Sequence, residues 1–169
     1  TGVAKEIQSE GGDAIFVNAD ISLNEGWASL VGQAVEKYGS FSIVVNNAGF
    51  THKNQSMFTV SEENYDRIYA VNVKSLYWSA KNVASILEKT GGGVMITVAS
   101  VAGIRPRPGL TWYNGSKAAA ITTSRSMAVE LAPKKIRVNI INPVMGETAM
   151  LEDFMGMPDT PDNRKKFLD

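Results

Sequence analysis

Residues 93–143 decide the fold: "GVMITVASVAGIRPRPGLTWYNGSKAAAITTSRSMAVELAPKKIRVNIINP". The apolar, β-branched segment 93–100 predicts a buried strand, and 136–143 predicts another. Between them, 111–132 has the composition and length of a helix, after a loop punctuated by prolines. Two strands joined through a helix form a parallel βαβ unit, so we expect a parallel sheet.

The remaining chain repeats this alternation. Segments 14–20 and 42–49 are rich in β-forming residues and predict two more strands. Apolar residues recur at helical spacing in 22–39, where Ser22 and Glu25 suggest a capping box, and 61–89 predicts a long helix. The predicted class is therefore α/β with a parallel sheet.

Polar and small residues follow each predicted strand. They are Asp20, Asn46 to Gly49, Ser100, and Asn142 with Pro143. Ligands of open parallel sheets bind beyond the carboxyl ends of the strands, so we expect one cleft to collect all of these residues.

The composition excludes several classes of function. The 169 residues suit one domain, and 17 basic residues balance 17 acidic ones, which gives no electrostatic case for nucleic acid or an anionic membrane. The chain has no cysteine and one histidine, so neither disulfides nor a multi-histidine metal site is expected. No apolar run has the length of a membrane span, and we expect a cytoplasmic enzyme or binding domain.

Tyr113 and Lys117 lie four residues apart and share one face of the predicted helix. A phenol has a pKa of about 10, and a neighbouring cation is expected to lower it toward neutrality. Ser100 adds a neutral donor that can hold a substrate oxygen. The three side chains suit proton exchange with a carbonyl or alcohol oxygen, for which a dinucleotide would supply the hydride.

Several motifs, in order, resemble the short-chain dehydrogenases/reductases. They are "NNAG" (46–49), Asn72 in "VNV" (71–73), Ser100, "YNGSK" (113–117) and "NPVMGET" (142–148). The resemblance implies a Rossmann-type doubly wound parallel sheet and an NAD(P)-dependent oxidoreductase acting on a small secondary alcohol or ketone. Whether the cofactor is NAD or NADP stays open.

The resemblance also implies roles for single residues. Tyr113 would be the acid/base, Lys117 would lower its pKa and bind the nicotinamide ribose, and Ser100 would polarise the substrate oxygen. Asn72 would hold a water that connects Lys117 with solvent. The implied cofactor contacts are Asp20, Ile21, Asn47, Ala48, Gly49, Tyr113, Lys117, Pro143, Val144 and Thr148, with Val144 at a position where the family usually has glycine. No metal is expected.

Compared with the family, the sequence lacks the first two strands, with their glycine-rich loop, and the last strand. We therefore expect 1–169 to be a single partial domain in which 145–169 forms a substrate lid. In the family's strand order 3-2-1-4-5-6 the segment 14–20 would stand roughly 14 Å from its nearest partner and leave an open face. Such a chain is expected to bind a dinucleotide poorly.

Further expectations concern assembly and substrate. The family pairs its two long helices into homodimers or homotetramers, and we expect Tyr77, Trp78 and Met127 on their outer faces. His52 is expected to be a surface loop residue. The stretch "RPRPGLTWYN" (105–114) resembles 3-oxoacyl-carrier-protein reductase-like and sugar dehydrogenase-like members.

Two alternatives remain open. In the first, the chain is a dinucleotide-fold module without catalysis. In the second, it belongs to the longer epimerases and dehydratases that share the Tyr–Lys motif. A serine hydrolase is excluded because the sequence has no G-x-S-x-G motif and a single imidazole.

Overall fold

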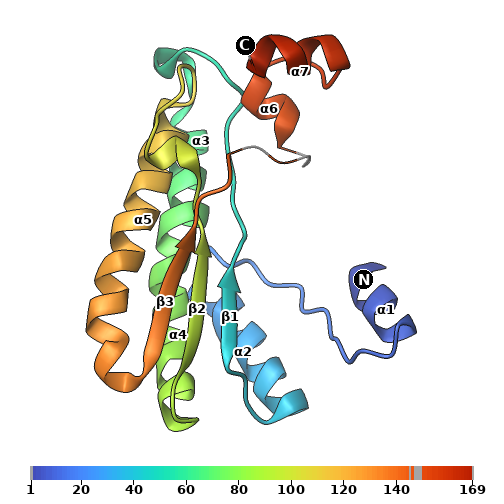
Figure 1. The fold of residues 1–169 in the computed structure, drawn as a ribbon, viewed down its shortest axis with the longest axis vertical. Coiled ribbons are helices and arrows are strands. Elements are labelled where there is room, and N and C mark those ends of the chain that lie inside the picture. The colour runs from blue at the N-terminus through green and yellow to red at the C-terminus, as the bar shows by residue number, and fades with distance from the viewer. Residues whose placement is uncertain (1, 145, 147–149, 169) are drawn as a thin grey trace.

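The centre of the molecule is a parallel sheet of three strands in the order β1-β2-β3 (Figure 1). The computed structural model describes residues 2–144, 146 and 150–168. The strands are β1 (Ile43–Asn46), β2 (Gly93–Val98) and β3 (Ile136–Ile141). Both neighbouring pairs are parallel, which confirms the βαβ units predicted from the sequence.

Three helices cover one face of this sheet: α2 (Asn24–Tyr38), α4 (Ser75–Lys89) and α5 (Thr111–Leu131). Their apolar sides enclose a core that consists of Trp27, Val83, Leu87, Met95, Ile136 and Val138. The other described elements are α1 (Gly2–Ser9), η1 (Met57–Thr59), α3 (Glu62–Tyr69), η2 (Ala70–Lys74), η3 (Val101–Gly103), η4 (Ala132–Lys134), α6 (Leu151–Met155) and α7 (Pro161–Leu168).

The long helix predicted for 61–89 forms, but it is interrupted. Ser61 caps α3 by accepting a hydrogen bond from the backbone N–H of Asn64. One turn of π-helix, η2, then separates α3 from α4 and contains Asn72. Such single turns of π-helix inside α-helices are frequent at functional sites.

The strand predicted for 14–20 is absent, because that segment has no described strand beside it to pair with. It instead connects α1 to α2 as an irregular chain. The capping box predicted for Ser22 and Glu25 does not form, because Leu23 is the N-cap residue of α2. The backbone N–H and hydroxyl of Ser22 both donate to Asp20 Oδ1, at 2.9 and 2.7 Å.

The opposite face of the sheet is open within the described residues, as the sequence comparison with the family led us to expect. Ile43, Val45 and Ile141 are each more than half exposed there. Paired strands and a single covered face make this an incomplete Rossmann-type sheet.

The expected outer face of α4 and α5 needs a correction. Trp78 and Met127 pack against the core instead of pointing outward, because the sheet lies on their side of the helices. Tyr77 is half exposed, as expected.

The core predicts a clear difference between two Leu→Ala substitutions. Leu87 is fully buried between α4 and the sheet, whereas Leu23 is half exposed. Leu87→Ala is expected to lower the free energy of unfolding by about 2–5 kcal/mol, because it leaves a cavity. Leu23→Ala is the matched control, with an expected loss below about 1 kcal/mol. Urea titration followed by Trp fluorescence measures both, and equal losses would contradict this placement of the core.

Candidate active site

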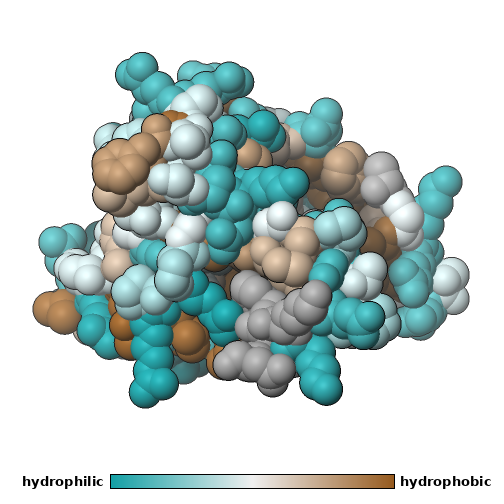
Figure 2. All heavy atoms as spheres, turned by 90° about the horizontal axis from the view of Figure 1, so that it is seen from above, coloured by the Kyte–Doolittle hydropathy of each residue, from teal (hydrophilic) through white to brown (hydrophobic). Residues whose placement is uncertain are grey.

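The carboxyl ends of the three strands open into a cavity of about 500 Å³. Figure 2 views the molecule from this side, where polar atoms surround separate apolar areas. The predicted site residues that line the cavity are Asn47, Ala48, Gly49, Ser100, Tyr113, Lys117, Pro143 and Val144. One cavity therefore collects residues from segments almost a hundred positions apart, as the order of parallel strands requires.

Tyr113 and Lys117 lie on the first turns of α5 and face the end of β2. Both side chains are buried, and the Lys117 ammonium lies 5.7 Å from the centroid of the Tyr113 ring. Ser100 Oγ accepts the N–H of Ala102 at 3.1 Å, so its own proton is available to the nearby Tyr113 phenol, whose pKa it lowers. The three groups thus form one connected set.

A glycine allows this close approach. A Cβ at Gly103 would stand 2.7 Å from the Lys117 carbonyl carbon and 2.7 Å from the Ala118 nitrogen. Any larger residue would push η3 away from α5. The short turn after β2 therefore holds Ser100 against the beginning of α5.

Burial sets the charge state of Lys117. Its Nζ donates to the carbonyl of Val98 at 3.0 Å, and burial lowers the pKa of Lys117 from 10.5 to about 8. Desolvation disfavours the ammonium form, and no carboxylate is recorded beside it among the described residues. Lys117 remains mostly charged at pH 7 and loses its proton in mildly alkaline solution.

The expectation for the Tyr113 phenol was wrong in direction. Burial raises the pKa of Tyr113 above 10.0, and the hydrogen bond from Ser100 opposes this only in part. The lysine does not reverse the effect, because its ammonium lies over the ring and donates to Val98. In this structure the phenol is a proton donor held in its neutral form.

Asn72 holds the loop after β1 against α5. Its Oδ1 accepts from Phe50 N at 2.8 Å, and its Nδ2 donates to Phe50 O and to Ser116 Oγ, both at 2.9 Å. Ser116 in turn donates to the carbonyl of Tyr113 at 2.7 Å. The amide therefore connects the "NNAG" loop with the turn that carries Tyr113. Sequence analysis did not single out Ser116, although it lies inside the "YNGSK" motif.

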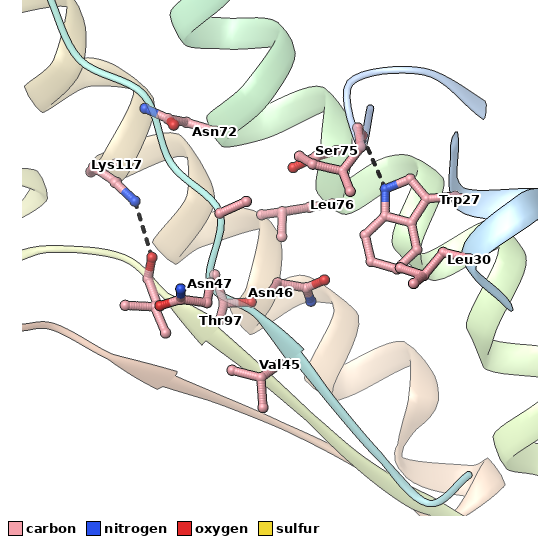
Figure 3. A pocket seen from close by; sticks show the side chains of 13 residues that line it. Trp27, Leu30, Val45, Asn46, Asn47, Asn72, Ser75, Leu76, Thr97 and Lys117 are labelled. Carbon is pink, nitrogen blue, oxygen red and sulfur yellow. Dashed lines mark hydrogen bonds between the residues drawn. The ribbon is translucent and has the colours of Figure 1, made fainter. Parts of the chain in front are cut away.

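A smaller cavity of about 100 Å³ adjoins the first and shares Asn47, Ala48, Val98 and Lys117 with it. Figure 3 shows Lys117 and Asn72 on one side of it and Trp27 and Leu30 of α2 on the other. Ile21 lines this cavity, and its carbonyl accepts the Trp27 indole N–H at 3.0 Å.

Asp20 lines neither cavity. The two hydrogen bonds from Ser22 hold the pKa of Asp20 below its usual value; burial opposes them, and the charge of Arg67 adds the smallest lowering effect. Gly26 packs directly on this turn, since a Cβ there would lie 2.0 Å from the Asp20 carbonyl oxygen.

The lining fits a polar, elongated ligand such as a dinucleotide. Gly49 brings bare backbone beside the site, because a Cβ there would stand 3.3 Å from Lys117 Nζ and 3.6 Å from Asn72 Oδ1. Both side-chain polar atoms of Asn46 and the Oδ1 of Asn142 are buried without partners among the described residues. Buried polar atoms are normally hydrogen-bonded, so a ligand with hydroxyl and amide groups suits this edge of the sheet.

The carboxyl-terminal segment contributes to the cavity wall. Met150 and Phe154 line it, and the Phe154 ring packs on Tyr113 with centroids 5.1 Å apart. Pro143 and Val144 lie where the sequence placed them, after β3. Thr148 lies outside the described residues.

Two further aromatic side chains, His52 and Trp112, make defined hydrogen bonds. His52 is buried rather than exposed, which corrects the expectation of a surface loop residue. Its Nδ1 lies 2.8 Å from the Lys53 carbonyl, so this nitrogen carries the proton. Trp112, beside Tyr113, donates its indole N–H to the Met57 carbonyl and packs edge-on against Tyr65.

Within residues 2–144, 146 and 150–168, no cluster of three metal-ligating side chains is found. None of the helices described has the length and apolar character needed to cross a membrane.

Comparison with known proteins decides the family. A profile described as short chain dehydrogenase matches residues 1–158. This chain belongs to the short chain dehydrogenase family. It is 48% identical over 157 residues to 4-formylbenzenesulfonate dehydrogenase TsaC1/TsaC2 of Comamonas testosteroni, which covers 93% of the chain. It is 37% identical over 166 residues to 7alpha-hydroxysteroid dehydrogenase of Escherichia coli (strain K12), which covers 98% of the chain. The chain spans 62% and 63% of these two relatives' lengths.

Solved structures of the family agree with the observed fold. One is 3-ketoacyl-(acyl-carrier-protein) reductase from Brucella melitensis complexed with NADH, with a TM-score of 0.85 and 37% identity. The similarity covers 99% of this chain and 74% of that protein. The other is a 7α-hydroxysteroid dehydrogenase complexed with NADH and 7-oxo glycochenodeoxycholic acid, with a TM-score of 0.87, 36% identity, and coverage of 99% and 63%.

The buried ammonium predicts a pH-dependent stability difference between wild type and Lys117→Met. The folded-state pKa of about 8 lies below the ordinary 10.5, so the unfolded chain binds more protons between these values. Wild-type stability is therefore expected to rise relative to the variant by about 2 kcal/mol from pH 7 to pH 9.5. Chemical denaturation of both proteins at the two pH values measures this change. If the stability difference between the two proteins stays constant with pH, the pKa of Lys117 is not lowered in the folded protein, and this prediction is wrong.

Proposed function

We propose that this cavity transfers hydride between the nicotinamide of NAD or NADP and a small secondary alcohol or ketone. The observation that carries the proposal is that Ser100, Tyr113 and Lys117 line one cavity, with the Lys117 ammonium 5.7 Å from the centroid of the Tyr113 ring. The dinucleotide, when bound, supplies or accepts the hydride. The side chains of this chain supply the proton and orient the substrate.

Proton transfer is assigned to Tyr113. Its neutral phenol, kept protonated by burial, would donate to the oxygen of a ketone that gains hydride at carbon. Ser100 would hold that oxygen through its hydroxyl proton while charge develops. In the oxidative direction the phenol needs a lower pKa. Lys117, still mostly charged at pH 7, is the cation placed to stabilise its conjugate base.

The cofactor would lie along the ends of the strands. We assign its contacts to Ile21, to Asn47–Gly49, to Lys117 at the ribose, and to Pro143 and Val144 near the carboxamide, since all of them line the two cavities. Asp20 and Thr148 complete the set by resemblance alone. NADH in the two related structures supports a dinucleotide at this edge.

Asn72 is proposed as a positioning residue. Its amide is fully used in holding Phe50 and Ser116, so it fixes the distance between the cofactor loop and the acid/base. The water that the family resemblance attaches to Asn72 remains a prediction, as do a cytoplasmic location and assembly into homodimers or homotetramers.

The substrate is proposed to have an apolar body and an anionic group. Arg107 and Lys117 are the charged residues among those described around the large cavity, and no carboxylate lines it there. Leu110, Met150 and Phe154 provide apolar contacts. Two relatives support this class, because one is named for an aromatic sulfonate and another is complexed with a bile acid.

Loss of the phenol hydroxyl tests the acid/base assignment. Tyr113→Phe in the full-length protein is expected to lower kcat/KM by roughly 100- to 10,000-fold, because the variant has lost the group that donates the proton. Tyr77→Phe, at a half-exposed position on α4, is the matched control and is expected to change nothing. Nicotinamide absorbance with a panel of ketones and alcohols measures both. Unchanged turnover in Tyr113→Phe would disprove the assignment.

The charge at the cavity rim tests the substrate class. Arg107→Gln is expected to raise KM about 10-fold for 4-acetylbenzenesulfonate and to leave KM for acetophenone unchanged, because only the sulfonate interacts with the guanidinium. Arg125→Gln, on the exposed side of α5, is the control for lost surface charge. Equal effects on both ketones would contradict an anion-binding role for Arg107.

A second candidate is a dinucleotide-binding module without turnover. It is favoured by the raised pKa of the buried phenol. Calorimetric titration with NADH, combined with a single-turnover assay, separates the two candidates. Binding without any conversion over the ketone panel would favour the second.

A further inference from the structure

Asn54, in the loop between β1 and η1, joins three segments that surround the large cavity. Its backbone N–H donates to the Asp153 carbonyl at 2.7 Å. Its side-chain Nδ2 donates to the Phe154 carbonyl at 3.2 Å and to the Pro108 carbonyl at 3.1 Å. One residue therefore connects its own loop, the proline-rich loop before α5, and α6.

The neighbouring residue extends the same junction. Gln55 N–H donates to the Gly109 carbonyl at 3.1 Å, so two consecutive residues hold the proline-rich loop. All the acceptors in these hydrogen bonds are backbone carbonyls. The contacts therefore depend on where the backbone of the partner segments runs, and not on which side chains those segments carry.

Two glycines with positive φ fit against Asn54. Gly109 has φ 77°, and a Cβ there would lie 1.9 Å from Asn54 Oδ1. Gly156 has φ 69°, and a Cβ there would lie 3.0 Å from the Asn54 carbonyl oxygen and 3.1 Å from its Cβ. Left-handed backbone and close contact each favour glycine, so both loops are shaped around this asparagine.

The junction holds apolar groups over the acid/base. Phe154, whose carbonyl Asn54 binds, packs on the Tyr113 ring. Leu110 follows Gly109, is buried and lines the cavity. Helix α6 has five residues, too few to be stable by its own backbone hydrogen bonds, so contacts such as those from Asn54 determine where it lies.

We propose that Asn54 is a positioning residue that fixes α6 and the proline-rich loop as the substrate-side wall of the cavity. The role as a substrate wall rests on the proposed function. The cofactor contacts assigned above are other residues, namely Ile21, Asn47–Gly49, Lys117, Pro143 and Val144. Loss of the Asn54 amide therefore loosens the substrate side and leaves dinucleotide binding intact.

The test compares Asn54→Ala with Asn82→Ala in the full-length protein. Asn82 is a matched control, since its amide also bonds two partners, Asn24 and the Trp78 carbonyl, away from the large cavity. Asn54→Ala is expected to raise KM for acetophenone about 10-fold, the effect of one or two lost hydrogen bonds, with the Kd for NADH unchanged. Asn82→Ala is expected to leave both constants unchanged.

Chymotrypsin gives a readout that does not need activity. Cleavage at Leu151 and Phe154 is expected to accelerate in Asn54→Ala and to stay at the wild-type rate in Asn82→Ala. If wild type shows no turnover but Asn54→Ala still exposes α6, the proposed function fails and the junction stands. Unchanged cleavage of α6 in Asn54→Ala, or an equal weakening of NADH binding, would overturn the proposal.

A double substitution sharpens the test. Gly109→Ala alone is expected to displace Asn54 and to raise KM as Asn54→Ala does. In the Asn54→Ala background the added methyl group no longer meets the amide, so the two effects are expected to be less than additive. Full additivity would mean that Gly109 and Asn54 act independently, which contradicts a shared junction.

Discussion

A buried ammonium constrains the whole site. Lys117 has lost most of its water, and the hydrogen bond recorded for its Nζ goes to the Val98 carbonyl. Bare backbone at Gly49 lies beside this ammonium, and the Tyr113 ring lies beneath it. A buried ammonium needs hydrogen-bond acceptors around it, and the hydroxyl groups of a ligand are well suited to accept further hydrogen bonds from Lys117 Nζ.

The parallel sheet makes this arrangement possible. Because β1, β2 and β3 run in the same direction, the residues that follow them meet at one edge of the sheet. Asn72 and Ser116 then fix the remaining freedom between the loop after β1 and α5. The strand order determines which segments lie next to one another at this edge. The hydrogen bonds of Asn72 and Ser116 then fix the distance between the loop after β1 and α5.

Sequence patterns predict what depends on neighbours along the chain. The alternation of apolar runs gave β1, β2, β3 and the helices between them, and the spacing of Tyr113 and Lys117 placed both on one side of α5. The segment 14–20 has the composition of a strand, yet a strand needs a partner, which composition does not reveal. His52 has a polar, loop-like context, and its burial depends on segments remote in sequence.

The same distinction explains the error about the Tyr113 phenol. Spacing on a helix shows that a cation is near, but the sign of a pKa shift depends on whether desolvation or charge dominates, and desolvation is a property of the packed cavity. Phe154, far along the chain, packs on the Tyr113 ring, and its carbonyl accepts a hydrogen bond from Asn54. Desolvation of the Tyr113 phenol thus involves residues far apart in the sequence, which no local motif encodes.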